Sequence, residues 1–93
     1  MFKVNEYFDG KVKSLAFENT GGKYTIGVMA PGDYEFGTST VEVMTVISGK
    51  LNIQLPGTIE WKAFKTGESF TVDKDKKFKV KIEEESAYLC LYK

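Results

Sequence analysis

The stretch Phe78-Lys79-Val80-Lys81-Ile82-Glu83 alternates strictly between apolar and charged residues. A period of two places the apolar side chains on one face of an extended strand and the charged ones on the other. Leu51-Asn52-Ile53-Gln54-Leu55 repeats this alternation earlier in the chain, with neutral polar residues between the apolar ones. Both stretches predict half-buried β-strands, each with one face in a hydrophobic core.

Turn-forming residues interrupt the chain at short intervals, as at Asn19-Thr20-Gly21-Gly22, Pro31-Gly32 and Pro56-Gly57. Glycine adopts positive φ without steric cost and proline presets φ, so these residues favour tight turns. The runs between them are too short for most helices and fit strands. The predicted strands are 11–17, 24–29, 33–38, 42–48, 50–55, 59–65, 68–72, 77–83 and 86–92. This pattern predicts one all-β domain over residues 1–93, folded as a sandwich or a closed barrel.

The 93 residues carry thirteen basic and thirteen acidic side chains, so the formal net charge is zero. Without an overall positive field, a nucleic acid is not an expected partner. No apolar stretch approaches the ~20 residues of a membrane span, and the first residues lack the apolar core of a signal peptide. We therefore expect a cytoplasmic protein that binds neither nucleic acid nor membrane.

The chain contains no histidine and a single cysteine, Cys90. One cysteine excludes an internal disulfide and a cysteine-rich zinc site, and the apolar run around it predicts a buried, inert thiol. A metal site would need carboxylates alone, which suits Mg²⁺ or Ca²⁺ rather than a redox metal. We therefore expect no resident metal and no other cofactor.

Two spacings resemble the ends of the two motifs of the cupin superfamily, whose fold is a double-stranded β-barrel. The first runs from Glu42 to Gly49, and the second follows Gly67. Cupins hold a metal with imidazoles at positions that correspond here to Phe36, Thr38 and Phe70. The resemblance therefore implies a cupin-type, jelly-roll-like barrel that has lost its imidazole ligands.

A more specific resemblance extends from about residue 5 to residue 92. Its segments are Asn5 through Ser14, Gly27-Val28-Met29, Glu42 through Asn52 and Ser86 through Cys90. They resemble the pyrimidine/purine nucleoside phosphorylase family, a bacterial group of small single-domain cupins. This implies an enzyme of broad specificity that cleaves nucleosides with inorganic phosphate as co-substrate, giving the free base and α-D-ribose 1-phosphate. It also implies a homodimer that works without a metal.

Glu42 is the predicted catalytic residue. If it points into the barrel, as the motif glutamate of a cupin does, the strand period places Met44, Val46 and Ser48 on the same side. We expect it to accept hydrogen bonds from ribose hydroxyls or to favour positive charge developing at C1′. The alternative is a structural carboxylate paired with a lysine or tyrosine at the mouth of the barrel.

The phosphate must meet cations or directed N–H and O–H donors. Lys11 and Lys13 lie two residues apart and so share one face of a strand, and Ser14 adds a hydroxyl. We predict that these three residues bind phosphate. The alternative is an exposed strand with no ligand.

Bases as different as uracil and guanine can share a site that contacts their flat faces more than their edges. The predicted nucleoside pocket consists of Tyr7, Tyr34, Phe36, Thr38 and Phe70. Phe8 is a further candidate for stacking, and Tyr88 and Tyr92 are candidates for a dimer contact instead. Because the sequence contains no strong catalytic dyad, a second function stays open: a non-catalytic, metal-free cupin module that binds a sugar or a nucleobase.

Overall fold

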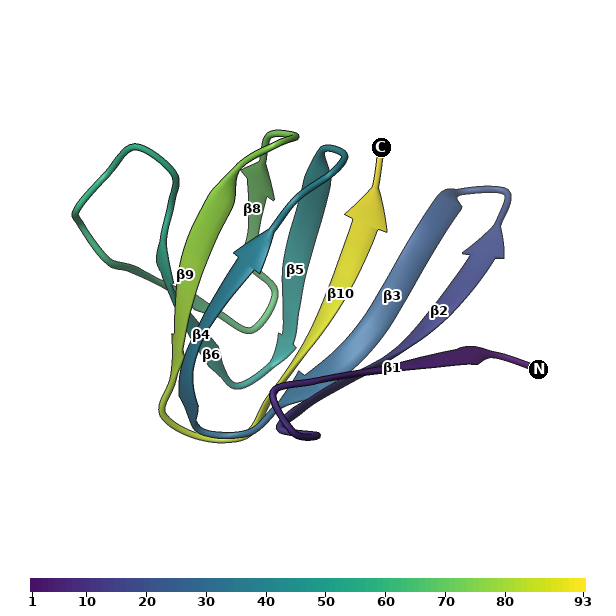
Figure 1. The fold of residues 1–93 in the computed structure, drawn as a ribbon, viewed down its shortest axis with the longest axis horizontal. Coiled ribbons are helices and arrows are strands. Elements are labelled where there is room, and N and C mark those ends of the chain that lie inside the picture. The colour runs from purple at the N-terminus through teal and green to yellow at the C-terminus, as the bar shows by residue number, and fades with distance from the viewer.

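The strands pair into two antiparallel sheets, and the computed structural model describes all residues 1–93 (Figure 1). The larger sheet has the order β1-β2-β3-β10-β5-β8, and the smaller sheet has the order β4-β9-β6-β7. The larger sheet consists of β1 (Lys3–Tyr7), β2 (Val12–Asn19), β3 (Gly22–Met29), β10 (Ser86–Tyr92), β5 (Glu42–Ser48) and β8 (Ser69–Val72). The smaller sheet consists of β4 (Gly32–Gly37), β9 (Lys77–Ile82), β6 (Lys50–Gln54) and β7 (Lys62–Lys65). The structure holds no helix, and so none that could span a bilayer.

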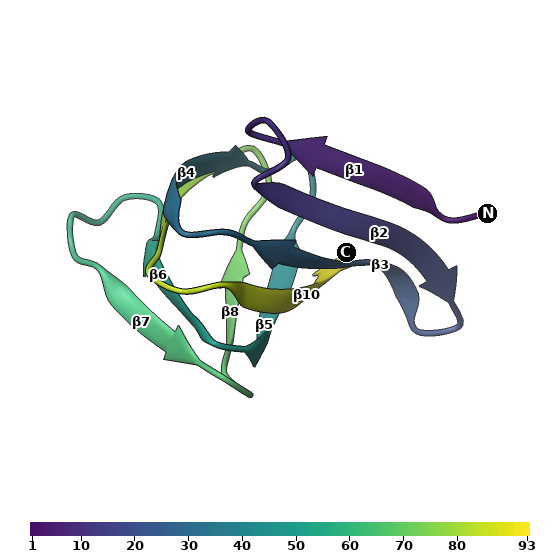
Figure 2. The same ribbon diagram turned by 90° about the horizontal axis from the view of Figure 1, so that it is seen from below.

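The predicted all-β architecture is confirmed, but the two sheets do not close into a barrel by hydrogen bonds. Each sheet keeps two edge strands, β1 and β8 in the larger and β4 and β7 in the smaller. Side chains packed between the sheets hold them together instead. β1 and β2 also extend past the smaller sheet, so this end of the larger sheet is not covered by it (Figures 1 and 2).

Two strand predictions need correction. β1 was not predicted, because its sequence is mostly polar and it pairs only with β2, in the register Val4↔Leu15. The predicted strand 59–65 is too long, since β7 begins only at Lys62. Ile59 and Trp61 are apolar residues of that pattern, yet they are 90% and 44% exposed in the loop before β7. Alternation in this loop therefore did not reflect a buried face.

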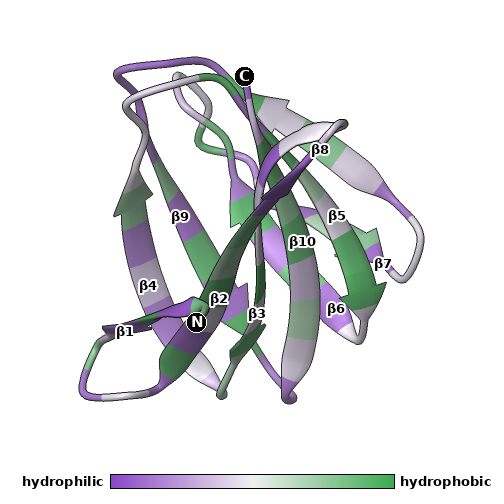
Figure 3. Ribbon diagram, turned by 90° about the vertical axis from the view of Figure 1, so that its right-hand side faces the viewer, coloured by the Kyte–Doolittle hydropathy of each residue, from purple (hydrophilic) through white to green (hydrophobic).

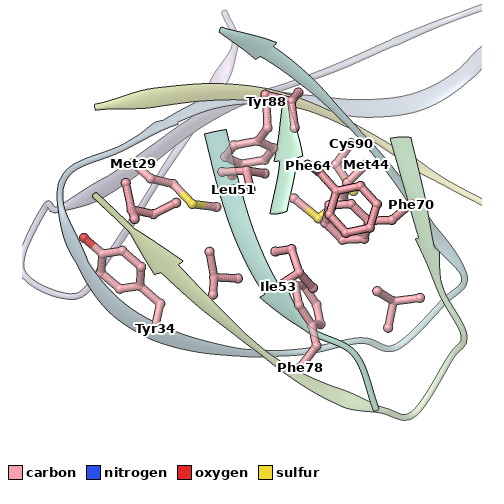
Figure 4. Close-up of a cluster of buried hydrophobic side chains, with 14 of the residues drawn as sticks. Met29, Tyr34, Met44, Leu51, Ile53, Phe64, Phe70, Phe78, Tyr88 and Cys90 are labelled. Atoms are coloured by element: carbon pink, nitrogen blue, oxygen red, sulfur yellow. The ribbon is translucent and has the colours of Figure 1, made fainter. Parts of the chain in front are cut away.

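The alternating strands place their apolar side chains between the sheets. Along β9, Phe78, Val80 and Ile82 are buried while the lysines between them are exposed, and the same strand shows alternating bands in Figure 3. Leu51 and Ile53 of β6, the neighbouring strand of the same sheet, are fully buried beside them, and Ile53 pairs with Val80. Figure 4 shows the resulting cluster, which contains side chains from both sheets. Because burial of apolar area is the main favourable term in folding, this layer is what stabilises the pair of sheets.

The chain crosses from the larger sheet to the smaller one at Gly49, between β5 and β6. Gly49 has a φ of +91°, and a side chain added there would collide with the hydroxyl of Ser86. That buried hydroxyl accepts a hydrogen bond from the amide of Lys50 (3.1 Å) and donates to the carbonyl oxygen of Glu84 (2.9 Å). The corner between the sheets therefore requires a residue without a β-carbon.

Replacing Gly49 with alanine tests this corner, and Gly67→Ala is the matched control. Gly67 has nearly the same φ of +89°, but nothing lies within 4 Å of a β-carbon there. We expect Gly67→Ala to cost about 1 kcal/mol of unfolding free energy for the backbone alone. Gly49→Ala adds the collision with Ser86, so we expect it to cost roughly 1–3 kcal/mol more. Urea unfolding of the two variants measures the difference, and equal losses would show that the Ser86 contact is unimportant.

Candidate functional site

A cavity of about 350 Å³ lies between the two sheets. It is lined by Tyr7, Phe8, Ser14, Met29, Glu35, Phe36, Gly37, Glu42, Met44, Phe78, Tyr88, Cys90 and Tyr92. On the far side, near β7 and β8, the core is filled, and the rings of Phe64 and Phe70 lie 4.7 Å apart. A mostly apolar cavity of this size with a few polar groups is typical of a small-molecule site.

The polar wall of the cavity comes from β5 and β10, which pair in the larger sheet. Glu42 lies opposite Tyr92 in the register, and Cys90 lies opposite Met44. The thiol of Cys90 donates to Oε1 of Glu42 at 3.6 Å. The hydroxyl of Tyr92 lies 2.9 Å from Oγ1 of Thr25 on β3. The period of two turns all of these side chains inward, so the carboxylate of Glu42 and the phenol of Tyr92 both line the cavity near the start of β5.

Burial controls the protonation of these groups. It raises the pKa of Glu42 above its ordinary value, and the hydrogen bond from Cys90 partly offsets this. Burial, and then the charge of Glu42, raises the pKa of Cys90 to about 12. Burial likewise raises the pKa of Tyr88 to about 12 and raises that of Tyr92. A thiol held in its neutral form is a poor nucleophile, so Glu42 is the group on this wall that changes charge in the ordinary range.

The aromatic wall faces the polar one and comes partly from the turn between β1 and β2. Phe8 and Asp9 adopt positive φ values of 54° and 57°. This conformation is uncommon for a bulky residue. It brings the ring of Phe8 to 4.9 Å from Tyr34 and 5.6 Å from Phe36, both on β4 of the smaller sheet. The turn thus bridges the two sheets and closes part of the cavity with an aromatic ring.

Four predicted site residues line the cavity, namely Glu42, Ser14, Tyr7 and Phe36. Three predicted members of the nucleoside pocket, Tyr34, Thr38 and Phe70, lie outside the lining of this cavity. Tyr34 is buried and donates to the carbonyl oxygen of Ala30 at 2.6 Å. Thr38 donates to the carbonyl oxygen of Asp73 at 2.6 Å, and Phe70 packs in the core with Phe64. These side chains are occupied in holding the fold.

Lys11 and Lys13 are not gathered with Ser14 into one group. Both lysines are exposed while Ser14 is buried, because neighbouring residues of a strand point to opposite faces. The amine of Lys13 lies 3.4 Å from a carboxylate oxygen of Glu6. The two lysines border a separate hollow of about 320 Å³. No lysine lines the cavity of about 350 Å³ between the sheets.

The cavity residues that sequence reasoning did not assign to the site include Tyr88, Cys90 and Tyr92, all on β10. The two tyrosines were interpreted as candidates for a dimer contact, but both line the cavity. The predicted burial of Cys90 is confirmed. The strand period already placed Tyr88 and Tyr92 on the same face as this buried cysteine, and that was the available signal.

The residues of this site do not fit a metal. The positions that correspond to the imidazoles of a cupin hold Phe36, Thr38 and Phe70, whose side chains offer at most one hydroxyl. Nowhere in the chain do three histidine, cysteine, aspartate or glutamate side chains gather as a metal would require. We therefore derive no step that passes through a metal ion.

Comparison with solved structures confirms the type of fold. A protein of unknown function from Vibrio parahaemolyticus is 42% identical and superposes with a TM-score of 0.96, covering 100% of this chain and 99% of that one. An RmlC-like cupin from Shewanella frigidimarina is 15% identical, with a TM-score of 0.77 and coverage of 98% and 82%. At that identity the likeness concerns the fold alone, and it identifies the two-sheet architecture as cupin-type.

Comparison of sequences identifies the family. The family model described as pyrimidine/purine nucleoside phosphorylase matches residues 2–92. A protein from Pseudomonas paraeruginosa with that name is 59% identical over 93 residues, covering 100% of both chains. The chain therefore belongs to the pyrimidine/purine nucleoside phosphorylase family.

Proposed function

We propose that this protein is a broad-specificity nucleoside phosphorylase. It cleaves purine and pyrimidine ribonucleosides with inorganic phosphate and releases the free base and α-D-ribose 1-phosphate. The observation that carries the proposal is family membership over residues 2–92, which include every residue of the cavity. The cavity adds support, because it has room for a sugar and offers both aromatic rings and polar groups.

In this reaction a phosphate oxygen forms a bond to C1′ as the bond from C1′ to the base nitrogen breaks. The electron pair of that bond leaves with the base, which then takes up a proton. A β-nucleoside that gives an α-phosphate has inverted at C1′, so phosphate and base occupy opposite faces of the ribose. The catalytic task is to position three groups and to stabilise charge, which needs neither a covalent nucleophile nor a metal.

The proposed roles follow the two walls. Phe8, Phe36 and Tyr7 offer flat apolar surfaces against which bases of different shape can stack. Glu42 lies on the opposite wall with a carboxylate that is half-buried and ionisable. A carboxylate in a site of low dielectric stabilises an electron-poor ribose strongly, and it also accepts hydrogen bonds from ribose hydroxyls.

For phosphate, we propose that the hydroxyl of Ser14 contributes inside the cavity. Tyr88 lies on the neighbouring wall and keeps its proton, so it is a second donor. Lys11 and Lys13, on the outer face, would act by attracting the anion rather than by touching it at C1′. Inorganic phosphate is the co-substrate, and no cofactor is needed. We also propose that the protein acts as a homodimer in the cytoplasm.

Incubating the protein with uridine and adenosine, with and without phosphate, tests the function. We expect free base from both nucleosides only when phosphate is present, together with ribose 1-phosphate. Base release without phosphate would indicate a hydrolase. Binding of nucleoside without any release would indicate the non-catalytic module.

Replacing Glu42 with glutamine tests the carboxylate. We expect kcat/KM to fall about 100-fold, because one charge that stabilises the transition state is removed. In the wild type we expect activity to fall as the pH drops through the raised pKa of Glu42, where the carboxylate is neutralised. Glu60→Gln, on the exposed loop before β7, is the matched control and should keep full activity.

Glu42→Gln should also change the free energy of unfolding, in a direction that a damaged fold would not produce. A carboxyl whose pKa is raised by burial stabilises the fold when protonated and loses that contribution as the pH rises through its pKa. Glu42→Gln should therefore be more stable than the wild type at pH 7, and the gain should shrink below the ordinary value of 4.5. Unchanged turnover in this stabilised variant would remove Glu42 from the mechanism.

Two places for the phosphate can be distinguished: inside the cavity at Ser14, or at the outer hollow beside the two lysines. The test is to measure the KM for phosphate in three variants, Ser14→Ala, Lys11→Ala and Lys13→Ala. We expect Ser14→Ala to raise the KM about tenfold, the loss of one hydrogen bond to a charged group. We expect the lysine variants to change it much less, and mainly at low salt, since exposed charges are screened. A large effect confined to the lysine variants would place phosphate at the outer hollow.

A further inference from the structure

The carboxylate of Glu42 has a single hydrogen-bond donor in this structure. The thiol of Cys90 on β10 donates to its Oε1 atom at 3.6 Å, and no lysine forms an ion pair with it. Glu42 is half-buried, whereas Cys90 is 1% exposed. An ionised group loses hydration on burial and needs donors in place of water. The thiol is therefore the protein's own contribution to holding this charge.

The register shows that a stronger donor lies close by but is engaged elsewhere. Tyr92 is the residue of β10 directly opposite Glu42, and a phenol is a stronger donor than a thiol. The Tyr92 hydroxyl, however, lies 2.9 Å from Oγ1 of Thr25 on β3. The carboxylate instead meets Cys90, which lies two residues before Tyr92 and so on the same inward face of β10.

A thiol suits a carboxylate that must also bind substrate. An ionised carboxylate accepts hydrogen bonds through two oxygens, and the thiol occupies only Oε1. Because S–H is a weak donor, it orients the group without strongly offsetting its charge. A purely apolar neighbour, such as Met44 opposite Cys90, fills space but does not fix the orientation of a carboxylate. The pair therefore combines a held orientation with one acceptor oxygen that no protein group uses.

We propose that Cys90 is a positioning residue whose thiol holds Oε1 of Glu42 and leaves Oε2 for the ribose, an inference that rests on the proposed function. Cys90 itself makes no bond to substrate. The thiol keeps its proton, because burial and then the charge of Glu42 raise its pKa to about 12. A protonated thiol stays a donor throughout the neutral range and is a poor nucleophile. Cys90 thus acts through Glu42.

Several titratable groups surround the carboxylate. The cavity brings to it Tyr7 from β1, Glu35 from β4 and Tyr88, Cys90 and Tyr92 from β10. Two exposed lysines lie at this end of the sheet, Lys23 opposite Tyr92 and Lys93 beside Val41, while the partner on β8 is Val72. Burial raises the pKa of the Glu42 carboxyl, and the hydrogen bond from Cys90 lowers it. Removing the thiol should therefore raise that pKa further, so the carboxylate is neutralised at a higher pH.

The pH dependence of kcat/KM in Cys90→Ala tests the proposal. We expect the acidic limb to move to higher pH by about 0.5–1 pH unit, for the loss of a weak hydrogen bond to a charged group. At pH 7 we expect kcat to fall about tenfold with the nucleoside KM nearly unchanged, since positioning acts mainly in the transition state. Cys90→Ser keeps a donor and should retain most of the wild-type profile. Should Cys90→Ala fail to fold, Cys90→Val fills the space without a donor and gives the same comparison.

Val72→Ala is the matched control. Val72 is buried and pairs with Glu42 from the other side of β5, outside the lining of the cavity. The substitution removes packing beside the carboxylate but no hydrogen bond, so the acidic limb should stay where it is in the wild type. Equal shifts in Val72→Ala and Cys90→Ala would overturn the proposal, because loosened packing would then explain both.

Titration of the Glu42 carboxyl carbon by NMR, without nucleoside, separates this inference from the proposed function. Glu42→Gln identifies the signal by its loss. We expect the midpoint in Cys90→Ala to lie above that of the wild type, by about as much as the kinetic limb moves. An unchanged midpoint would overturn the proposal even in a protein that cleaves nucleosides. A shifted midpoint in a wild type that releases no base would confirm the hydrogen bond and overturn the proposed function, and with it the role of the pair in the reaction.

Discussion

At Gly49 the chain leaves one sheet and enters the other, and the parity of its inward side chains changes over this corner, because the register shifts at Ile47, opposite the step from Ala87 to Tyr88 of β10. Met44 and Val46 of β5 point into the core from the larger sheet, whereas Leu51 and Ile53 of β6 do so from the smaller one. A regular strand could not make this change, since its side chains keep a strict period of two. The positive φ of Gly49 and the hydroxyl of Ser86 fix the corner, so both apolar faces meet in one core.

The two faces pack together near β7 and β8, where Phe64 contacts Phe70, but they leave a cavity near β4. Its polar wall places Glu42 in a partly buried position, which raises the pKa of that carboxyl and costs stability at neutral pH. Its aromatic wall depends on Phe8 and Asp9, which hold positive φ values. Strained backbone and buried charge are costs that a purely structural core would avoid. Their presence around one cavity favours a binding and catalytic site over a packing defect.

The larger sheet serves two purposes on its two faces. Inward, it supplies most of the polar groups of the cavity, and outward it exposes apolar side chains such as Leu15 and Ile26, which are register partners on β2 and β3. The smaller sheet has a core face inside and a solvated face outside. A chain of 93 residues buries a modest fraction of its surface on folding. The strands β2 and β3, which carry residues of the site on their inward faces, keep these two apolar side chains in contact with solvent.

Alternation and turn residues by themselves determined the class of fold, most strands and the burial of Cys90, and the composition determined the absence of imidazole ligands. The same period of two implies that Lys13 and Ser14 point to opposite faces, although we predicted that they bind phosphate together. Only the tertiary structure decided which inward side chains line the cavity. Tyr34 and Phe36 share one face of β4, yet the Tyr34 hydroxyl binds the carbonyl oxygen of Ala30 while Phe36 reaches the cavity. The physical reason is that periodicity fixes the face of a strand, whereas the neighbours on that face depend on how two sheets pack.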